Sequence, residues 1–168
     1  MPTAKKPATE AAARTDATLL LTRDHTEVHK LFKQYDKAAE AGADASDRQA
    51  MAEEICMKLT IHATAEEEIF YPAARAAGID SALLDEAEVE HASAKDLIAQ
   101  IRSMSPDEDL YDAKVKVLGE YIDHHVKEEE EEMFPKCRKS EMDLADLAAQ
   151  LAERKAELLA EAAEEVDA

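Results

Sequence analysis

The sequence predicts an all-α protein: an up-down-up-down four-helix bundle with an additional helix at the C-terminus. Two observations predict this class. The 168 residues include only three glycines and five prolines, which leaves little material for the turns of an all-β protein. Four long segments also carry apolar residues at intervals of three or four, as expected for the buried face of a helix. Long helices joined by short connections pack as antiparallel neighbours.

Start and stop signals divide the chain into five helices. Ser105 and Glu108 form a capping box with Pro106 at the first helical position, which predicts the start of the fourth helix. Gly78 stands where a C′ glycine ends the second helix, and Pro72 should kink or end that helix locally. The expected helices are about 16–40, from Ser46 or Asp47 to 77, from an N-cap at Ser81 to 104, 106–134, and from an N-cap at Ser140 to 168.

The same signals suggest three parts. Residues 1–16 contain lysines but no apolar secretion core, so we expect a disordered leader. Residues 17–137 form the bundle domain, and residues 140–168 form an acidic C-terminal helix. The leucines of this last helix have near-heptad spacing. They either pack on the end of the bundle or pair with a second copy to give a homo-oligomer.

The net charge is strongly negative, with 39 acidic and 20 basic residues and a formal charge of −19. Such a surface repels phosphate backbones and anionic lipids, so we expect neither a nucleic-acid partner nor a membrane partner. Cys56 and Cys137 lack a C-x-x-C spacing, and we interpret them as reduced thiols. These features together predict a cytoplasmic protein.

An internal repeat links the second and fourth helices. Residues 62–72 read His-x-x-x-Glu-Glu-x-x-Phe-Tyr-Pro, and residues 125–135 read His-x-x-x-Glu-Glu-x-x-Met-Phe-Pro. Each matched position of the second copy lies 63 residues after its counterpart. Chance does not readily repeat six positions at one spacing, and this is the strongest signal in the sequence.

Each bundle helix places one histidine on its apolar stripe. In the first helix His25 stands between Leu21 and Val28, where the stripe requires a buried residue. Side chains at i and i+4 lie about 5–6 Å apart at Cβ, so a histidine and a glutamate so spaced reach one metal ion, or the glutamate bridges two. The candidate ligands are His25, His62, Glu66, His91, His125 and Glu129.

A cation is needed among these side chains. A buried carboxylate without a partner is costly, and no lysine or arginine lies on the stripes at this level. Four imidazoles and two carboxylates suit iron, manganese or zinc. A lone histidine on an apolar stripe is more often a hydrogen-bonded core residue, but the combination of all six favours a metal site.

Four neighbouring residues are ambiguous. Glu67 and Glu130 directly follow the two glutamate ligands, and we interpret them as supporting or surface residues. His124 also begins an H-x-x-x-E pattern, but the repeat selects the histidine after it, because the proline then follows ten residues later in both copies. His29 lies one turn after the first histidine and is either an additional ligand or part of the bundle edge.

These motifs resemble the hemerythrin-like (HHE cation-binding) family over about residues 17–137. The matching segments are Asp24–Phe32, His62–Pro72, Glu90–His91 and His125–Pro135. The resemblance implies two Fe ions in an oxo- or hydroxo-bridged di-iron centre, with Glu66 and Glu129 as bridging carboxylates and Mn or Zn as alternatives. It also implies binding of dioxygen at an open position on one iron. Ferritin-like di-iron bundles use Glu-x-x-His instead, so the spacing separates the two classes.

One position departs from the oxygen-carrying hemerythrins, which have five histidine ligands, two of them one turn apart on the third helix. Here Ala87 and Lys95 stand four residues before and after His91. One iron therefore lacks a ligand unless His29, a tyrosine or water supplies it. An iron with fewer ligands more readily binds and turns over peroxide, NO or oxygen.

Three functions compete at this point. The first is a non-catalytic protein that binds dioxygen or a related small ligand for sensing, storage or delivery of oxygen or iron. The second is a di-iron oxidoreductase of catalase-like, ferroxidase or NO-handling type, acting on peroxide, O2 or NO. The third is a metal-free structural or interaction bundle. The resemblance favours the first, and the missing histidine favours the second.

Overall fold

The computed structural model describes residues 15–168, and all regular structure in this part of the chain is helical, as predicted. The bundle helices are α2 (Ala17–Glu40), α3 (Ala45–Ala65), α5 (Ser81–Ser103) and α6 (Tyr111–Glu128). Short segments continue two of them: η1 (Glu66–Phe70) and α4 (Tyr71–Ala76) after α3, and η2 (Glu129–Met133) and α7 (Phe134–Arg138) after α6. The last helix is α8 (Leu144–Asp167). The predicted four-helix bundle with an additional C-terminal helix is confirmed.

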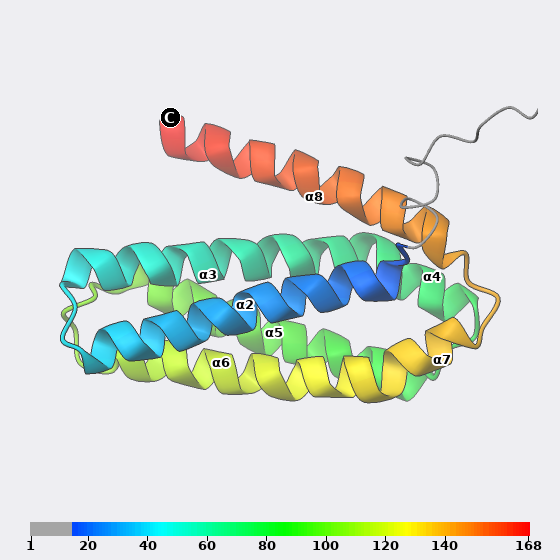
Figure 1. Cartoon of the computed structure of the whole chain (residues 1–168), viewed down its shortest axis with the longest axis horizontal. Coiled ribbons are helices and arrows are strands. Elements are labelled where there is room, and N and C mark those ends of the chain that lie inside the picture. Colours follow the sequence, from blue (N-terminus) through cyan, green and yellow to red (C-terminus); the bar gives the residue numbers. More distant parts are fainter. Residues whose placement is uncertain (1–14) are drawn as a thin grey trace, which may run out of the picture.

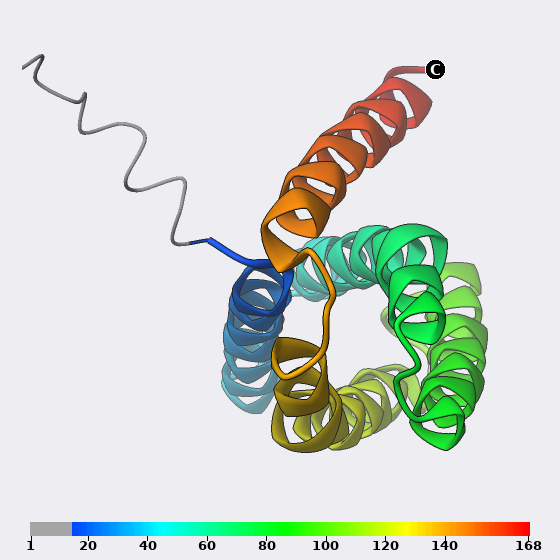
Figure 2. The ribbon, with the colours of Figure 1, turned by 90° about the vertical axis from the view of Figure 1, so that its right-hand side faces the viewer.

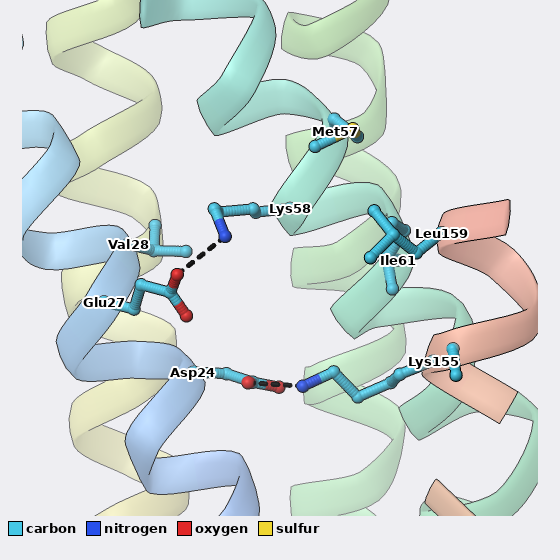
Figure 3. Close-up of a pocket in the computed structure, with 9 residues that line it drawn as sticks. Asp24, Glu27, Val28, Met57, Lys58, Ile61, Lys155 and Leu159 are labelled. Carbon is cyan, nitrogen blue, oxygen red and sulfur yellow. Dashed lines mark hydrogen bonds and ion pairs between the residues drawn. The ribbon is translucent and has the colours of Figure 1, made fainter. Parts of the chain in front are cut away.

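The four long helices run side by side with their neighbours antiparallel (Figure 1). Seen from the end they stand at the corners of a square, in the cyclic order α2, α3, α5, α6 (Figure 2). Helix α8 lies outside the square, across α2 and α3, and diverges from the bundle toward its C-terminus. Lys155 of α8 points toward Asp24 of α2 in the space between these helices (Figure 3).

Two helix ends lie at or next to the predicted positions. Asp16 caps α2 by accepting a hydrogen bond from the backbone N–H of Leu19 at 3.0 Å. Gly78 follows the end of α4 with φ +79°, a left-handed conformation that favours glycine. Of the predicted leader, residues 1–14 lie outside the described part of the chain.

Helices α3 and α5 begin slightly before the predicted positions. Asp44 occupies the N-cap position of α3, in place of Ser46 or Asp47. In α5 the cap is Asp80, whose side chain accepts from the backbone N–H of the second helical residue, and Ser81 is already helical. An aspartate just upstream thus takes the capping position in both cases.

The predicted start of the fourth helix is wrong. Half of the capping box forms, because the Ser105 backbone N–H donates to Glu108 Oε2 at 2.6 Å. However, Arg48 Nη1 donates to the carbonyl oxygen of Pro106 at 3.0 Å, which draws this carbonyl away from helical pairing. The segment stays in turns, passes through Leu110 at φ +73°, and only then begins α6.

The fifth helix also begins later than predicted. Its N-cap is Asp143, which accepts from the backbone N–H of Asp146 at 3.1 Å. The predicted cap, Ser140, instead donates from its hydroxyl to the carbonyl oxygen of Cys137 at 2.6 Å and remains in a turn. The first leucines of α8 pack on the bundle: Leu147 and Leu151 are buried and Leu144 packs against them, whereas Leu159 farther along is 52 % exposed. Pairing with a second copy stays a prediction.

Both copies of the repeat contain a π-helical turn that begins at the inner glutamate. The backbone N–H of Tyr71 donates to the carbonyl oxygen of Glu66, and Phe134 donates likewise to Glu129, five residues back in each case. A proline follows directly, and a proline ring clashes with the carbonyl four residues before it in a regular helix. The wider turn accommodates the proline and lets the helix continue. Pro72 therefore neither ends nor breaks its helix.

A buried polar layer divides the core into two apolar clusters. The cluster near α4, α7 and α8 includes Leu21, Phe70, Tyr71, Leu84, Met133, Phe134 and Leu151. The cluster at the other end includes Val28, Phe32, Tyr35, Ile55, Leu59, Ile98 and Leu118. The polar layer between them contains the six candidate ligands. Within residues 15–168, no helix has the length and apolar character that crossing a membrane requires.

Candidate metal centre

All six candidate ligands converge inside the bundle, each with at most 7 % of its surface exposed. Their donor atoms form two groups, within each of which the atoms lie no more than 4.8 Å apart. One group contains His25, His62, Glu66 and Glu129, and the other contains Glu66, His91 and His125. We call these the first and second groups.

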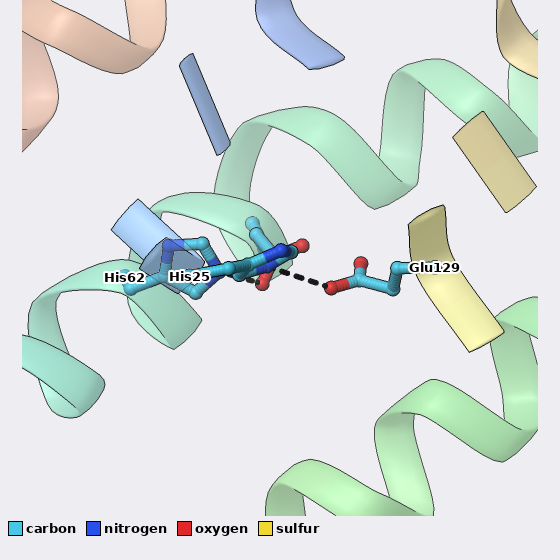
Figure 4. Close-up of side chains that lie close together, drawn as sticks. His25, His62 and Glu129 are labelled. Atoms are coloured by element: carbon cyan, nitrogen blue, oxygen red, sulfur yellow. Dashed lines mark ion pairs between the residues drawn. The ribbon is translucent and has the colours of Figure 1, made fainter. Parts of the chain in front are cut away.

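The two glutamates lie between the two groups. Glu66 Oε1 is 2.7 Å from His62 Nε2 and 3.6 Å from His91 Nε2. Glu129 Oε1 is 3.0 Å from His125 Nε2. The same oxygen is 3.3 Å from His25 Nε2 (Figure 4). Each carboxylate therefore reaches one histidine of each group, which is the arrangement that a bridging ligand requires.

The four histidines share one orientation, with Nε2 directed inward and Nδ1 directed outward to a carboxylate. The Nδ1 to oxygen distances are 3.2 Å for His25–Glu130, 2.8 Å for His62–Asp24, 3.3 Å for His91–Glu67 and 3.0 Å for His125–Glu90. A carboxylate only accepts, so the N–H lies on Nδ1, and in the neutral imidazole that binds a metal the Nε2 lone pair faces inward. Histidines that bind metals usually have such an outer partner.

These outer carboxylates connect the helices in a ring. Asp24 of α2 supports the histidine of α3, and Glu67, which follows α3, supports that of α5. Glu90 of α5 supports the histidine of α6, and Glu130, which follows α6, supports that of α2. Glu67 and Glu130 thus have the supporting role left open by the sequence. Asp24 and Glu90 were missed, although each directly precedes a candidate histidine.

The charges of the metal-free site are tightly coupled. Burial lowers the pKa of His62, but Glu66 and Asp24 outweigh this effect and raise it to about 10. Burial likewise lowers the pKa of His125, which Glu129 raises well above its ordinary value. Burial raises the pKa of Glu129, but His125, His25 and Glu66 together hold it well below its ordinary value. Protons thus supply the positive charge that a metal cation would supply.

The inward atoms fit a metal ion better than they fit one another. His25 Nε2, His62 Nε2, both oxygens of Glu66 and Glu129 Oε1 are buried without a hydrogen-bond partner of good geometry. Orphaned polar atoms of this kind are rare in protein interiors. Imidazole nitrogen and carboxylate oxygen are ligands for iron, manganese and zinc. The buried groups therefore fit metal binding, while the identity of the metal is left open.

Comparison with known proteins agrees with this geometry. The family model "Hemerythrin HHE cation binding domain" matches residues 16–137. The chain belongs to the hemerythrin HHE cation-binding domain family. The resemblance inferred from the motifs is thereby confirmed.

Two individual proteins are similar to the chain. The crystal structure of a hemerythrin HHE cation-binding domain-containing protein from Mycobacterium kansasii has a TM-score of 0.76 at 22 % identity, over 91 % of this chain and 93 % of that one. This likeness shows the shared fold and includes most of the chain. A DNA nickase from Nostoc sp. is 30 % identical over 125 residues, which are 71 % of this chain but only 32 % of the Nostoc protein.

A tyrosine hydroxyl lies among the donor atoms of the second group in this hemerythrin-family chain. The Tyr71 hydroxyl lies 3.2 Å from His91 Nε2 and 3.4 Å from His125 Nε2, and it donates to Glu129 Oε2 at 3.0 Å. Its counterpart in the second copy of the repeat is Phe134, whose ring stacks on His25 at a centroid distance of 6.0 Å. The two halves of the site thus differ by one hydroxyl group.

The other histidines lie outside the buried site. His29 is half exposed and lies 3.2 Å from Asp123 at the bundle edge. His124, with 66 % of its side chain exposed, lies 3.1 Å from Glu128 and with Glu90 forms a small surface group. The proline spacing thus selected the buried member of the adjacent histidine pair.

A small cavity adjoins the histidines. Its volume is about 30 Å³, and its apolar walls include Leu59, Ile98 and Ile122. The same cavity is lined by all four candidate histidines. It has room for a molecule of the size of water, dioxygen or peroxide and for little more.

Proposed function

We propose that this hemerythrin-family chain binds two iron ions and, at them, dioxygen or a related small ligand for sensing, storage or delivery of oxygen or iron. The observation that carries the proposal is the convergence of the histidine Nε2 atoms and the carboxylate oxygens inside the bundle. Each of the four histidines is also held from outside by a carboxylate at its Nδ1. A metal-free structural bundle does not require buried carboxylate oxygens that lack hydrogen-bond partners. The arrangement favours metal binding over that alternative.

Each candidate ligand has a role in the proposed metal site. His25 and His62 would hold one ion, His91 and His125 would hold the other, and Glu66 and Glu129 would reach both. The Tyr71 oxygen is placed to complete the second group. A pair of irons supplies reversible binding of dioxygen or electron transfer with peroxide. The apolar walls of the cavity limit the ligand to a few atoms and exclude bulk water.

Metal analysis of the purified chain tests this proposal. We expect two irons per chain, and a loss of most of the metal in Glu66→Ala and in Glu129→Ala. His124→Ala is the matched control, because it removes an exposed imidazole and should keep both ions. Less than one metal ion per chain after iron is supplied would refute the proposal. Two manganese or zinc ions instead would keep the site and change its metal.

A second candidate function is a di-iron oxidoreductase acting on peroxide, O2 or NO, and Tyr71 favours it. The phenol hydroxyl next to both histidines of the second group is a proton donor that a histidine ligand would not provide. Peroxide consumption by the iron-loaded chain should then exceed that of free iron and fall in Tyr71→Phe. Consumption equal to that of free iron would exclude this candidate.

The activity of the Nostoc relative is not carried over to this chain. The match spans about a third of that protein. A formal charge of −19 also repels a phosphate backbone.

A further inference from the structure

Helix α8 reaches the proposed metal site through one side chain. Lys155 forms an ion pair with Asp24 Oδ1 (Figure 3). The other oxygen, Asp24 Oδ2, lies 2.8 Å from His62 Nδ1. Both side chains are largely buried, with 24 % of Lys155 and 15 % of Asp24 exposed. Lys155 lies outside residues 16–137, the part of the chain that the family model matches. A helix added to the family domain thus contacts the support of a candidate ligand.

One other outer carboxylate has a comparable partner. Lys95 Nζ lies 2.5 Å from Glu67 Oε1, and the other oxygen of Glu67 supports His91. Within residues 15–168, the remaining two outer carboxylates, Glu90 and Glu130, form ion pairs with histidines alone. Each half of the site therefore contains one carboxylate that a lysine braces. Lys155 serves the first group, and Lys95 serves the second.

The surroundings of Asp24 explain why a brace matters there. A groove of about 220 Å³ opens beside Asp24 between α2, α3 and α8, with apolar residues on much of its wall. The other lysine on the groove, Lys58, already pairs with Glu27 at 2.6 Å. Without Lys155, the carboxylate of Asp24 has room to rotate toward solvent and away from His62 Nδ1. A charged carboxylate gains hydration by that movement.

We propose that Lys155 is a positioning residue for the first group, which holds Asp24 against His62 and thereby fixes the direction of His62 Nε2. The proposal rests on the proposed metal pair. It predicts an asymmetric effect, because the second group is supported by Lys95 of α5 and not by α8. Outer partners of metal-bound histidines typically change metal affinity by about 10- to 100-fold.

The test loads the full chain with Co²⁺ and follows metal release to excess chelator by visible absorption. His62→Ala and His91→Ala assign the two release phases to the two groups. In Lys155→Met we expect release from the first group to accelerate about 10- to 100-fold, with release from the second group unchanged within about twofold. Lys95→Met should reverse this pattern. Lys155→Arg should restore the slow phase.

Arg154→Met is the matched control for docking of α8. Arg154 directly precedes Lys155 in α8. It pairs with Glu68 at 2.7 Å and contacts no outer carboxylate. The inference is wrong if Lys155→Met releases metal at wild-type rates. It is also wrong if Lys155→Met and Arg154→Met both accelerate both release phases. Asp24→Asn should accelerate the same phase as Lys155→Met, and the double variant should release no faster than Asp24→Asn alone. A wild-type chain that binds no Co²⁺ and no iron would refute the proposed function instead.

Discussion

Replacing Tyr71 by phenylalanine removes one oxygen atom from the buried layer and leaves its shape unchanged. Burial, together with Glu129 and Glu66, raises the pKa of Tyr71 well above its ordinary value, so the hydroxyl stays protonated and donates. Its acceptor is Glu129 Oε2 at 3.0 Å, and the other oxygen of this carboxylate already lacks a partner. A hydrogen bond to a charged group contributes about 1.5–3 kcal/mol. We expect the free energy of unfolding of the metal-free chain to fall by that amount.

Guanidinium denaturation followed by circular dichroism measures this loss, with the m-value expected to stay constant. Tyr121→Phe is the control, because Tyr121 is 50 % exposed and should change stability by no more than about 0.5 kcal/mol. In the iron-loaded chain, a phenolate ligand gives a visible charge-transfer band, which Tyr71→Phe should lack. A loss of stability no larger than that of the control would refute the assignment of Tyr71 to the polar layer.

Two further predictions concern ionisable groups. Burial lowers the pKa of His62, but Glu66 and Asp24 raise it from 6.5 to about 10. A histidine whose pKa is higher in the folded than in the unfolded chain stabilises the fold at a pH below its unfolded pKa, and this contribution is lost as the pH rises through its folded pKa. The thermal midpoint of the metal-free chain should therefore decrease as the pH is raised from about 7 to about 10, whereas that of a metal-loaded chain should show little change. A midpoint that rises with pH in the metal-free chain would contradict the proposed charge coupling. Burial also raises the pKa of Cys56 and of Cys137 to about 11, so a thiol reagent at about pH 8 should modify the native chain at least about 100-fold more slowly than the unfolded chain. Rapid modification of the native chain would show that these thiols are not buried.

The buried stripes could be predicted from sequence because each depends on local spacing alone. In α2, Leu21, His25, Val28, Phe32 and Tyr35 are all buried, as the interval of three or four requires. The bundle follows, because four amphipathic helices joined by short loops bury their apolar stripes by facing them toward a common core. Predicting the histidines to be buried depended on the same rule.

The helix starts were less predictable because several local signals compete. At Ser105 the capping bond forms inside a turn, and a distant side chain, Arg48, holds the next carbonyl. The π-helical turns shift the buried positions after Glu66, so that Phe70 and Tyr71 are buried while Ile69 is only half-buried. A prediction that assumes regular α-helical spacing does not include the extra residue of a π-helical turn. The sequence therefore allowed a tyrosine as the additional ligand without identifying Tyr71.

The two halves of the site come from one repeated pattern but end up unequal. Under the proposed function, Tyr71 closes the second group, while its counterpart Phe134 has no atom that binds a metal. The open position for a small ligand would then belong to the ion held by His25 and His62, because Phe134 offers that ion no ligand atom; the cavity itself is lined by all four histidines. This is the half that Lys155 of α8 supports through Asp24. Under the two proposals together, the helix outside the family domain would act on the ion that is free to bind a ligand.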